Sequence, residues 1–119
     1  MHNFKELKIW QKAKGIVKDI YVLSETLPQT EKYAFTSQLQ RAAVSIPSNI
    51  AEGSGRGTNK DFCHFLDIAI ASSYELESLL LIGIDLNYFP DEKISNPIEN
   101  IHELQKMMVG FQTKLKALA

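Results

Sequence analysis

Apolar residues recur at steps of three and four along almost the whole chain, and no segment alternates apolar with polar residues over a useful length. The first spacing is typical of amphipathic α-helices, whereas alternation is typical of strands. Glycines and prolines divide the pattern into four segments. We predict helices over residues 4–26, 31–52, 59–87 and 91–118.

Local signals set the ends of the first three predicted helices. Pro28 ends the first helix, because proline disfavours helical backbone in the residue before it. Gly53 is predicted to be the left-handed C-cap of the second helix. Thr58 is predicted to cap the third helix, with Asp61 three residues later in a variant of the capping box.

Two prolines lie inside predicted helices, where each removes a backbone donor. Pro47 predicts a kink in the second helix, or a hinge with a functional motion. Pro97 leaves two alternatives for the fourth segment, which are a fresh start capped by Ser95 or Asn96 and a single kinked helix.

Four amphipathic helices with short connections predict an all-α, up-down-up-down four-helix bundle. A chain of 119 residues is long enough for one hydrophobic core, so we expect a single domain over residues 1–119. Helices of ~20 to 28 residues are about 30 to 42 Å long, which predicts a narrow rod.

The second predicted helix has two organised faces, whereas an ordinary surface helix has one. Its polar side chains lie about 120° from its apolar sector on a helical wheel. One interpretation is a solvated face. The other is a polar seam against the third helix or a neighbouring subunit, in which Arg41 pairs with Glu52 or Glu75. The predicted seam comprises Gln38, Arg41, Ser45, Asn49, Glu52 and Glu75.

The C-terminal half of the third predicted helix is apolar on every side over residues 76–86. Such a helix must be covered all round, whereas a four-helix bundle leaves each helix an outward strip. We therefore expect a homo-oligomer, in which Leu79, Leu81 and Ile82 form the apolar contact surface.

Composition narrows the compartment and the partners. With 45% hydrophobic residues, 23% charged residues and a net charge of −1, the chain is ordinary and globular, without the basic excess of a dedicated nucleic-acid binder. A single cysteine, Cys63, fits a reducing compartment. No apolar run approaches the ~20 residues that span a bilayer. We expect a cytoplasmic protein with no membrane partner.

Candidate catalytic and metal-binding groups are sparse. Asp61-x-x-His64 and Glu99-x-x-His102 have the spacing of metal-binding bundles, but both pairs are expected to point away from the core. Cys63 and His64 are adjacent, and neighbours on a helix do not face each other. We therefore expect no catalytic residue, no metal and no cofactor, and hence no enzyme.

Two groups of basic residues are candidates for nucleic-acid contact. Four lysines are expected on the side of the first helix opposite its core, namely Lys8, Lys12, Lys14 and Lys18. They form either a solvated face or, repeated around a ring, a strong local field. The loop over residues 53–58 precedes a helix N-terminus, which attracts anions. It is either a plain connection or a phosphate contact made by Arg56 and Lys60.

The most specific motif is the block over residues 38–53, Gln-Leu-x-Arg-Ala-Ala-x-Ser-Ile-x-x-Asn-Ile-Ala-Glu-Gly. Together with Phe4-x-x-Leu7-x-x-Trp10-Gln11 near the start, it resembles the small four-helix-bundle family encoded in intervening sequences of bacterial 23S ribosomal RNA genes. The resemblance implies a ring-shaped homo-oligomer, a pentamer. It extends to the accessory variability protein of diversity-generating retroelements, a basic ring that contacts nucleic acid and a reverse transcriptase.

The family resemblance implies packing and assembly roles for the seam residues and carries no activity to transfer. The leading hypothesis is a non-enzymatic, homo-oligomeric interaction or scaffold protein with RNA as a candidate partner. The alternative is a nucleic-acid-binding accessory protein that uses the lysine faces of an oligomeric ring on RNA or DNA.

Overall fold

Four long helices carry the fold, and a short 3₁₀ helix precedes each of the first two. The computed structural model describes residues 2–118 and has no strand in that range. The elements are η1 (Phe4–Glu6), α1 (Lys8–Ser24), η2 (Gln29–Glu31), α2 (Phe35–Ser54), α3 (Asn59–Asp85) and α4 (Asp91–Leu118).

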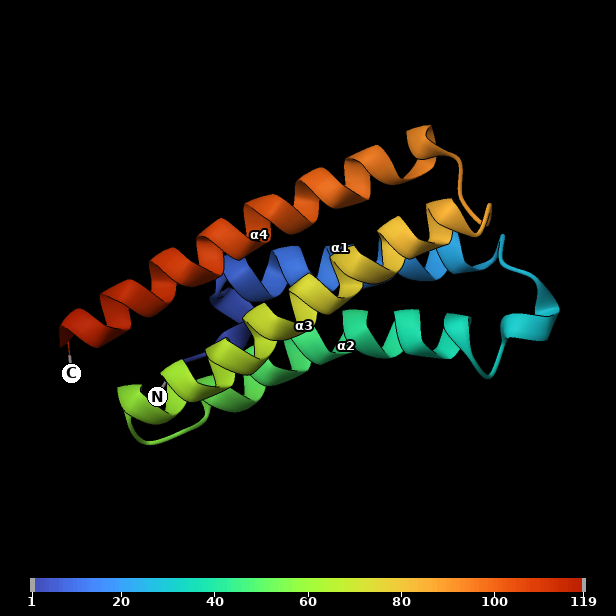
Figure 1. Ribbon diagram of the computed structural model, residues 1–119. Helices are drawn as coiled ribbons and strands as arrows, with labels where there is room; N and C mark the ends of the chain where they lie inside the picture. Colours follow the sequence, from blue (N-terminus) through green and yellow to red (C-terminus); the bar gives the residue numbers. More distant parts are fainter. Residues whose placement is uncertain (1, 119) are drawn as a thin grey trace.

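Successive helices run in opposite directions and pack side by side (Figure 1). Helices α1 and α3 each pack against both α2 and α4, but not against each other. They therefore occupy diagonally opposite corners of the predicted up-down-up-down bundle. The described residues extend over 46 × 24 × 20 Å, in agreement with the predicted narrow rod.

One hydrophobic core runs through the bundle and takes side chains from every long helix. Burial of one such side chain stabilises the fold by about 1.5 to 3 kcal/mol. The largest enclosed side chains are Ile20, Leu39, Ile46, Ile50, Phe62, Leu66, Leu76, Leu80, Ile101, Leu104 and Met108.

The first two helices begin later than predicted. Residues 4–6 form the separate η1, because Leu7 has extended backbone with φ −74° and ψ 127°. After Pro28 the chain forms η2, and the non-helical backbone of Ala34 delays α2 until Phe35. Each of these two predicted helices therefore included a short 3₁₀ helix that is separate from the α-helix in the structure.

Gly53 is not the left-handed C-cap that the sequence predicted. Helix α2 continues to Ser54, Gly55 follows with right-handed backbone, and no described glycine has a positive φ. A Cβ atom on Gly53 would lie 2.7 Å from Phe62 Cδ1 and 2.8 Å from Phe65 Cβ. The glycine is required because α2 and α3 approach each other closely there.

The left-handed cap lies instead at the end of α3, on Asn87, whose φ is 62°. The backbone N–H of Tyr88 donates to the Gly83 carbonyl at 2.8 Å, and that of Asn87 donates to the Ile84 carbonyl at 2.9 Å. This pair of hydrogen bonds is a Schellman motif, and asparagine tolerates the left-handed backbone that the motif requires.

The other boundary predictions have mixed outcomes. The capping role of Thr58 is confirmed, because its Oγ1 accepts the backbone N–H of Asp61 at 3.1 Å. The fresh start at Pro97 is wrong, since α4 runs unbroken from Asp91 through this proline. Pro47 likewise lies inside an unbroken α2.

Candidate assembly surfaces

Part of the predicted polar seam joins α2 to α3 within one chain. Ser45 Oγ lies 2.8 Å from Ser72 Oγ, and Asn49 Nδ2 donates to the Ser45 carbonyl at 2.8 Å. Asn49 also donates to Ser45 Oγ at 3.1 Å. Ser72 was not among the predicted seam residues, because its position on the third helix does not reveal which residue of the second helix it meets.

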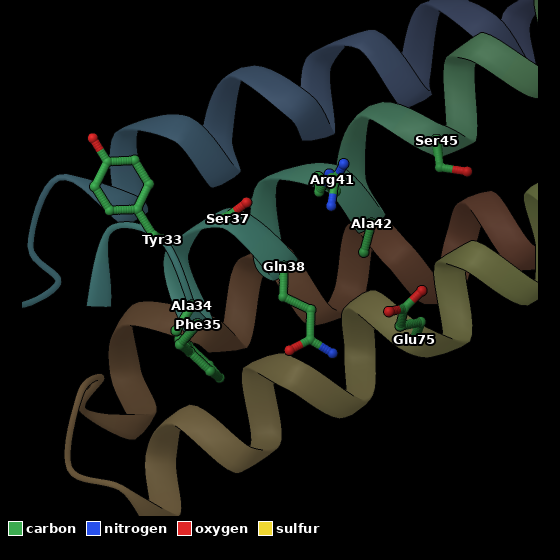
Figure 2. Close-up of a pocket in the computed structure, with 9 residues that line it drawn as sticks. All are labelled: Tyr33, Ala34, Phe35, Ser37, Gln38, Arg41, Ala42, Ser45 and Glu75. Atoms are coloured by element: carbon green, nitrogen blue, oxygen red, sulfur yellow. The ribbon is translucent and has the colours of Figure 1, made fainter. Parts of the chain in front are cut away.

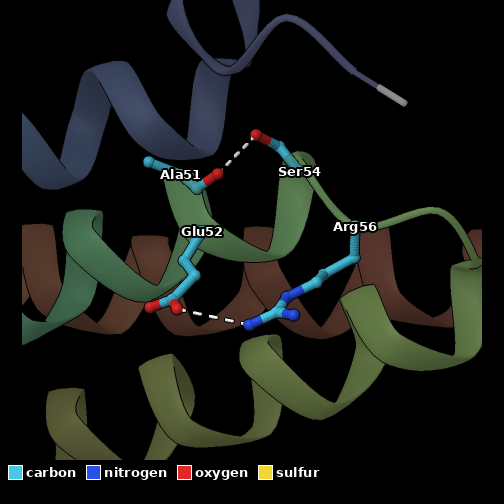
Figure 3. Close-up of polar contacts among 4 residues, drawn as sticks. All are labelled: Ala51, Glu52, Ser54 and Arg56. Atoms are coloured by element: carbon cyan, nitrogen blue, oxygen red, sulfur yellow. Dashed lines mark hydrogen bonds and ion pairs between the residues drawn. The ribbon is translucent and has the colours of Figure 1, made fainter.

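Glu52 does not pair with Arg41. Its Oε1 accepts a hydrogen bond at 3.3 Å from Arg56 Nη2, one helical turn later (Figure 3). The Arg56 guanidinium also lies 4.7 Å from the ring centroid of Phe65. Arg56 thus contacts both α2 and α3 at their connection, and it is exposed. Lys60 is exposed in the first turn of α3.

The remaining seam residues line a groove of about 730 Å³ between α2 and α3. Gln38 on α2 and Glu75 on α3 extend into the space between the two helices (Figure 2). Arg41 also lines this groove, yet among residues 2–118 it forms no ion pair with Glu52 or Glu75. The predicted pairing of Arg41 is therefore absent within one chain.

The apolar surface predicted on α3 is only partly exposed. Leu79 is 6% exposed and belongs to the core, so its assignment to the outer surface is wrong. Leu81 and Ile82 are 49% and 43% exposed, as predicted, and Tyr74 beside them is 57% exposed. These three side chains, with Glu77, Ser78 and Asp85, line a shallow groove of about 340 Å³.

The predicted single lysine face on α1 is divided. Lys12 Nζ turns toward α4, where it lies 3.2 Å from Glu103 Oε2 and donates to Asn100 Oδ1 at 3.3 Å. Lys14 Nζ lies 5.2 Å from the ring centroid of Trp10, on the side near α2. Residues two apart point about 200° apart on a helix, so these lysines cannot share a face. Lys8 and Lys18 are exposed.

A polar cluster that the sequence did not indicate joins α3 to α4. Glu77 Oε2 lies 2.7 Å from His102 Nε2, and Gln105 Nε2 donates to Glu77 Oε1 at 3.1 Å. Partial burial acts to raise the pKa of Glu77, but hydrogen bonds from His102 and Gln105 and the charge of His102 outweigh it. The pKa of Glu77 is therefore lowered.

One of the candidate metal ligands, His102, belongs to this cluster. His102 is bound to Glu77 on the neighbouring helix, and Asp61 and His64 are exposed on α3. Among the residues that the structure describes, no three histidine, cysteine or carboxylate side chains gather to hold a metal ion.

No helix in residues 2–118 is long and apolar enough to cross a membrane.

Comparison with known proteins identifies the bundle. The sequence profile of the family described as "23S rRNA-intervening sequence protein" matches residues 5–110. The chain belongs to this family. It is also similar to the crystal structure of a protein of unknown function from the S23 ribosomal protein family of Bacteroides thetaiotaomicron. The TM-score is 0.81 at 23% identity, over 87% of this chain and 97% of that one. No curated protein matches.

Membership of the 23S rRNA-intervening sequence protein family accounts for the fold, and the geometry explains part of the motif over residues 38–53. Ser45 bonds α2 to α3 through Ser72, Asn49 donates to Ser45 within α2, and Gly53 allows the two helices to approach. Arg41 and Glu75 have no such role within one chain, and both line an open groove.

Proposed function

We propose that the chain is a non-enzymatic interaction or scaffold protein that works as a ring-shaped homo-oligomer. The observation that carries this proposal is the exposed apolar strip on α3 formed by Tyr74, Leu81 and Ile82. Full burial of one such aliphatic side chain contributes about 1.5 to 3 kcal/mol. Because these side chains are about half exposed in one chain, a second copy that covers the strip would recover the corresponding part of this free energy. Family resemblance implies a ring of five copies.

The α2–α3 groove supports the same proposal. Arg41 and Glu75 line one open groove without an ion pair to each other. Charges at an interface fix its register and specificity more than they add affinity. A neighbouring copy that contributes ion-pair partners to Arg41 and Glu75 would supply the contacts that these two residues lack within one chain.

An exposed-residue substitution tests the proposal. Leu81→Asp places a charge on the α3 strip, and we expect the oligomer to dissociate to a monomer in sedimentation velocity at micromolar concentration. Leu118→Asp is the control, because it makes the same substitution at an exposed leucine on α4, outside the strip. Equal masses for wild type, Leu81→Asp and control would contradict the role of the strip.

RNA association is the second proposal, and it rests on the family to which the chain belongs. The remaining exposed lysines, Lys8, Lys14 and Lys18, would have to act on several copies at once to build a basic field. Binding driven by phosphate contacts weakens steeply with salt. Gel-shift titrations with RNA and duplex DNA at low and at physiological salt test it, and no salt-sensitive shift for either would reject it.

A further inference from the structure

Charge is distributed unequally between α1 and α3, which occupy opposite corners of the bundle. Helix α1 carries four lysines and only one acidic residue, Asp19. Helix α3 carries five acidic residues and, apart from Lys60 in its first turn, neither lysine nor arginine. Because α1 and α3 occupy opposite corners of the bundle, the molecule has a basic side and an acidic side.

The acidic side coincides with the exposed apolar strip. We call it the α3 face, formed by Tyr74, Leu81, Ile82 and Asp85. The groove along this strip is lined by the carboxylates of Glu77 and Asp85 and by no lysine or arginine of the described chain. It combines apolar area with negative charge at the edge.

The basic side also offers exposed apolar area. We call it the α1–α2 face, formed by Trp10, Lys14, Val17, Arg41 and Val44. Two neighbouring grooves of about 300 and 370 Å³ share Val44, one next to Lys14 and the other next to Arg41. No carboxylate in residues 2–118 lines either groove.

We infer that the α3 face of one copy docks on the α1–α2 face of a second copy. This pairing rests on the proposed homo-oligomer and specifies its interface. The apolar strip of one copy meets the apolar grooves of the other, and the carboxylate of Asp85 faces Lys14 and Arg41. Pairing of two α3 faces is disfavoured, because it would bring carboxylates opposite carboxylates, and like charges across an interface are costly.

The two faces belong to different corners of one bundle, so one chain cannot bring them together. The contact is therefore heterologous, with a different surface contributed by each partner. Heterologous contacts repeat from copy to copy and close into a ring when the rotation between copies allows it. In this arrangement Arg41 gains an ion-pair partner, which it lacks within the described chain.

Two variants, each blocked on one face, test the pairing by mixing. Ile82→Arg blocks the α3 face and Val44→Glu blocks the α1–α2 face, and both positions are exposed. We expect each variant alone to be monomeric in native mass spectrometry at micromolar concentration. An equimolar mixture retains one intact α3 face and one intact α1–α2 face, so we expect a 1:1 heterodimer that weakens with added salt.

Controls separate folding defects from interface defects. Circular dichroism should show wild-type helix content for both variants. If either variant fails to fold, Leu81→Arg replaces Ile82→Arg and Lys14→Glu replaces Val44→Glu, because Leu81 and Lys14 are exposed. Glu99→Lys, exposed on α4 and outside both faces, should retain the wild-type mass.

The experiment distinguishes a failure of the proposed oligomer from a failure of the proposed pairing. A monomeric wild type would overturn both the oligomer and the pairing. An oligomeric wild type with no heterodimer in the mixture would overturn only the pairing. Dimers of Val44→Glu alone would show that two α3 faces pair with each other.

Discussion

Gly53 illustrates how one residue sets the distance between two helices. A Cβ atom there would lie less than 3.0 Å from the Phe62 ring and from the Phe65 Cβ. The Phe62 ring cannot move away easily, because it is buried in the core. Helices α2 and α3 would have to separate where they are most closely packed. The glycine therefore matters for packing between helices rather than for ending one.

We expect Gly53→Ala to destabilise the fold by about 1 to 3 kcal/mol, the usual penalty for overpacking a core. Gly110→Ala is the matched control, because no atom lies within 4 Å of a Cβ built there. In an open helical position this change stabilises by roughly 0.5 to 1 kcal/mol. Urea denaturation of both variants measures the difference, and two changes of the same sign would contradict the packing role.

Glu77 should make stability depend on pH. Its folded pKa lies below the ordinary value of 4.5, so its contribution is fully present above that value. It is lost as the pH falls through the lowered folded pKa. We expect the stability difference between wild type and Glu77→Gln to be largest near neutral pH and to disappear under acidic conditions. Thermal melts across this range measure it, and a constant difference would contradict the prediction.

At the level of elements, residues 100–105 of α4 make polar contacts with two neighbouring helices, α1 and α3. Asn100 and Glu103 meet Lys12 of α1, and His102 and Gln105 meet Glu77 of α3. Glu103 is largely exposed, whereas Gln105 is buried. The contact with α3 should therefore matter more, because loss of a buried hydrogen bond leaves its partner unsatisfied.

We expect Gln105→Ala to cost about 1 to 2 kcal/mol, because it removes a buried donor to Glu77. Lys12→Ala should cost less than about 1 kcal/mol, because its partner Glu103 is largely exposed and ion pairs at the surface contribute little. Chemical denaturation compares the two variants. A larger loss for Lys12→Ala would contradict the relative importance of the two contacts.

The sequence predicted the elements well wherever the signal was local. Thr58 acted as predicted, since helix capping involves only neighbouring residues. Helix α1 ends at Ser24, two residues before the predicted end and four before Pro28. Gly53 was misread because glycine serves both as a cap and as a close contact, and its contact with Phe62 depends on how the helices pack. The Glu77–His102 pair was invisible, because 25 positions separate the two residues and only the bundle brings them together.

At the scale of the whole molecule, the sequence indicated unpaired surfaces but placed them imperfectly. An apolar stretch that surrounds a helix does not reveal which side faces the core, so Leu79 was grouped with Leu81 although it is buried. The charges of α1 and α3 can be counted from the sequence. Their position on opposite corners depends on the order in which the helices pack.

Arg41→Ala should weaken assembly more than Lys12→Ala, because Arg41 has no ion pair within the described chain whereas Lys12 pairs with Glu103. We expect Arg41→Ala to reduce the mass in size-exclusion chromatography with light scattering and to leave helix content unchanged. Equal masses for the two variants would argue against an assembly role for Arg41.

The central claim is that another copy of this chain covers the exposed strip on α3. A dilution series of the wild-type protein in analytical ultracentrifugation tests it most directly. We predict a species several times heavier than the 13.4 kDa chain, with five copies as the expected number, that persists to micromolar concentration. A single species at the mass of one chain across the series would contradict the claim.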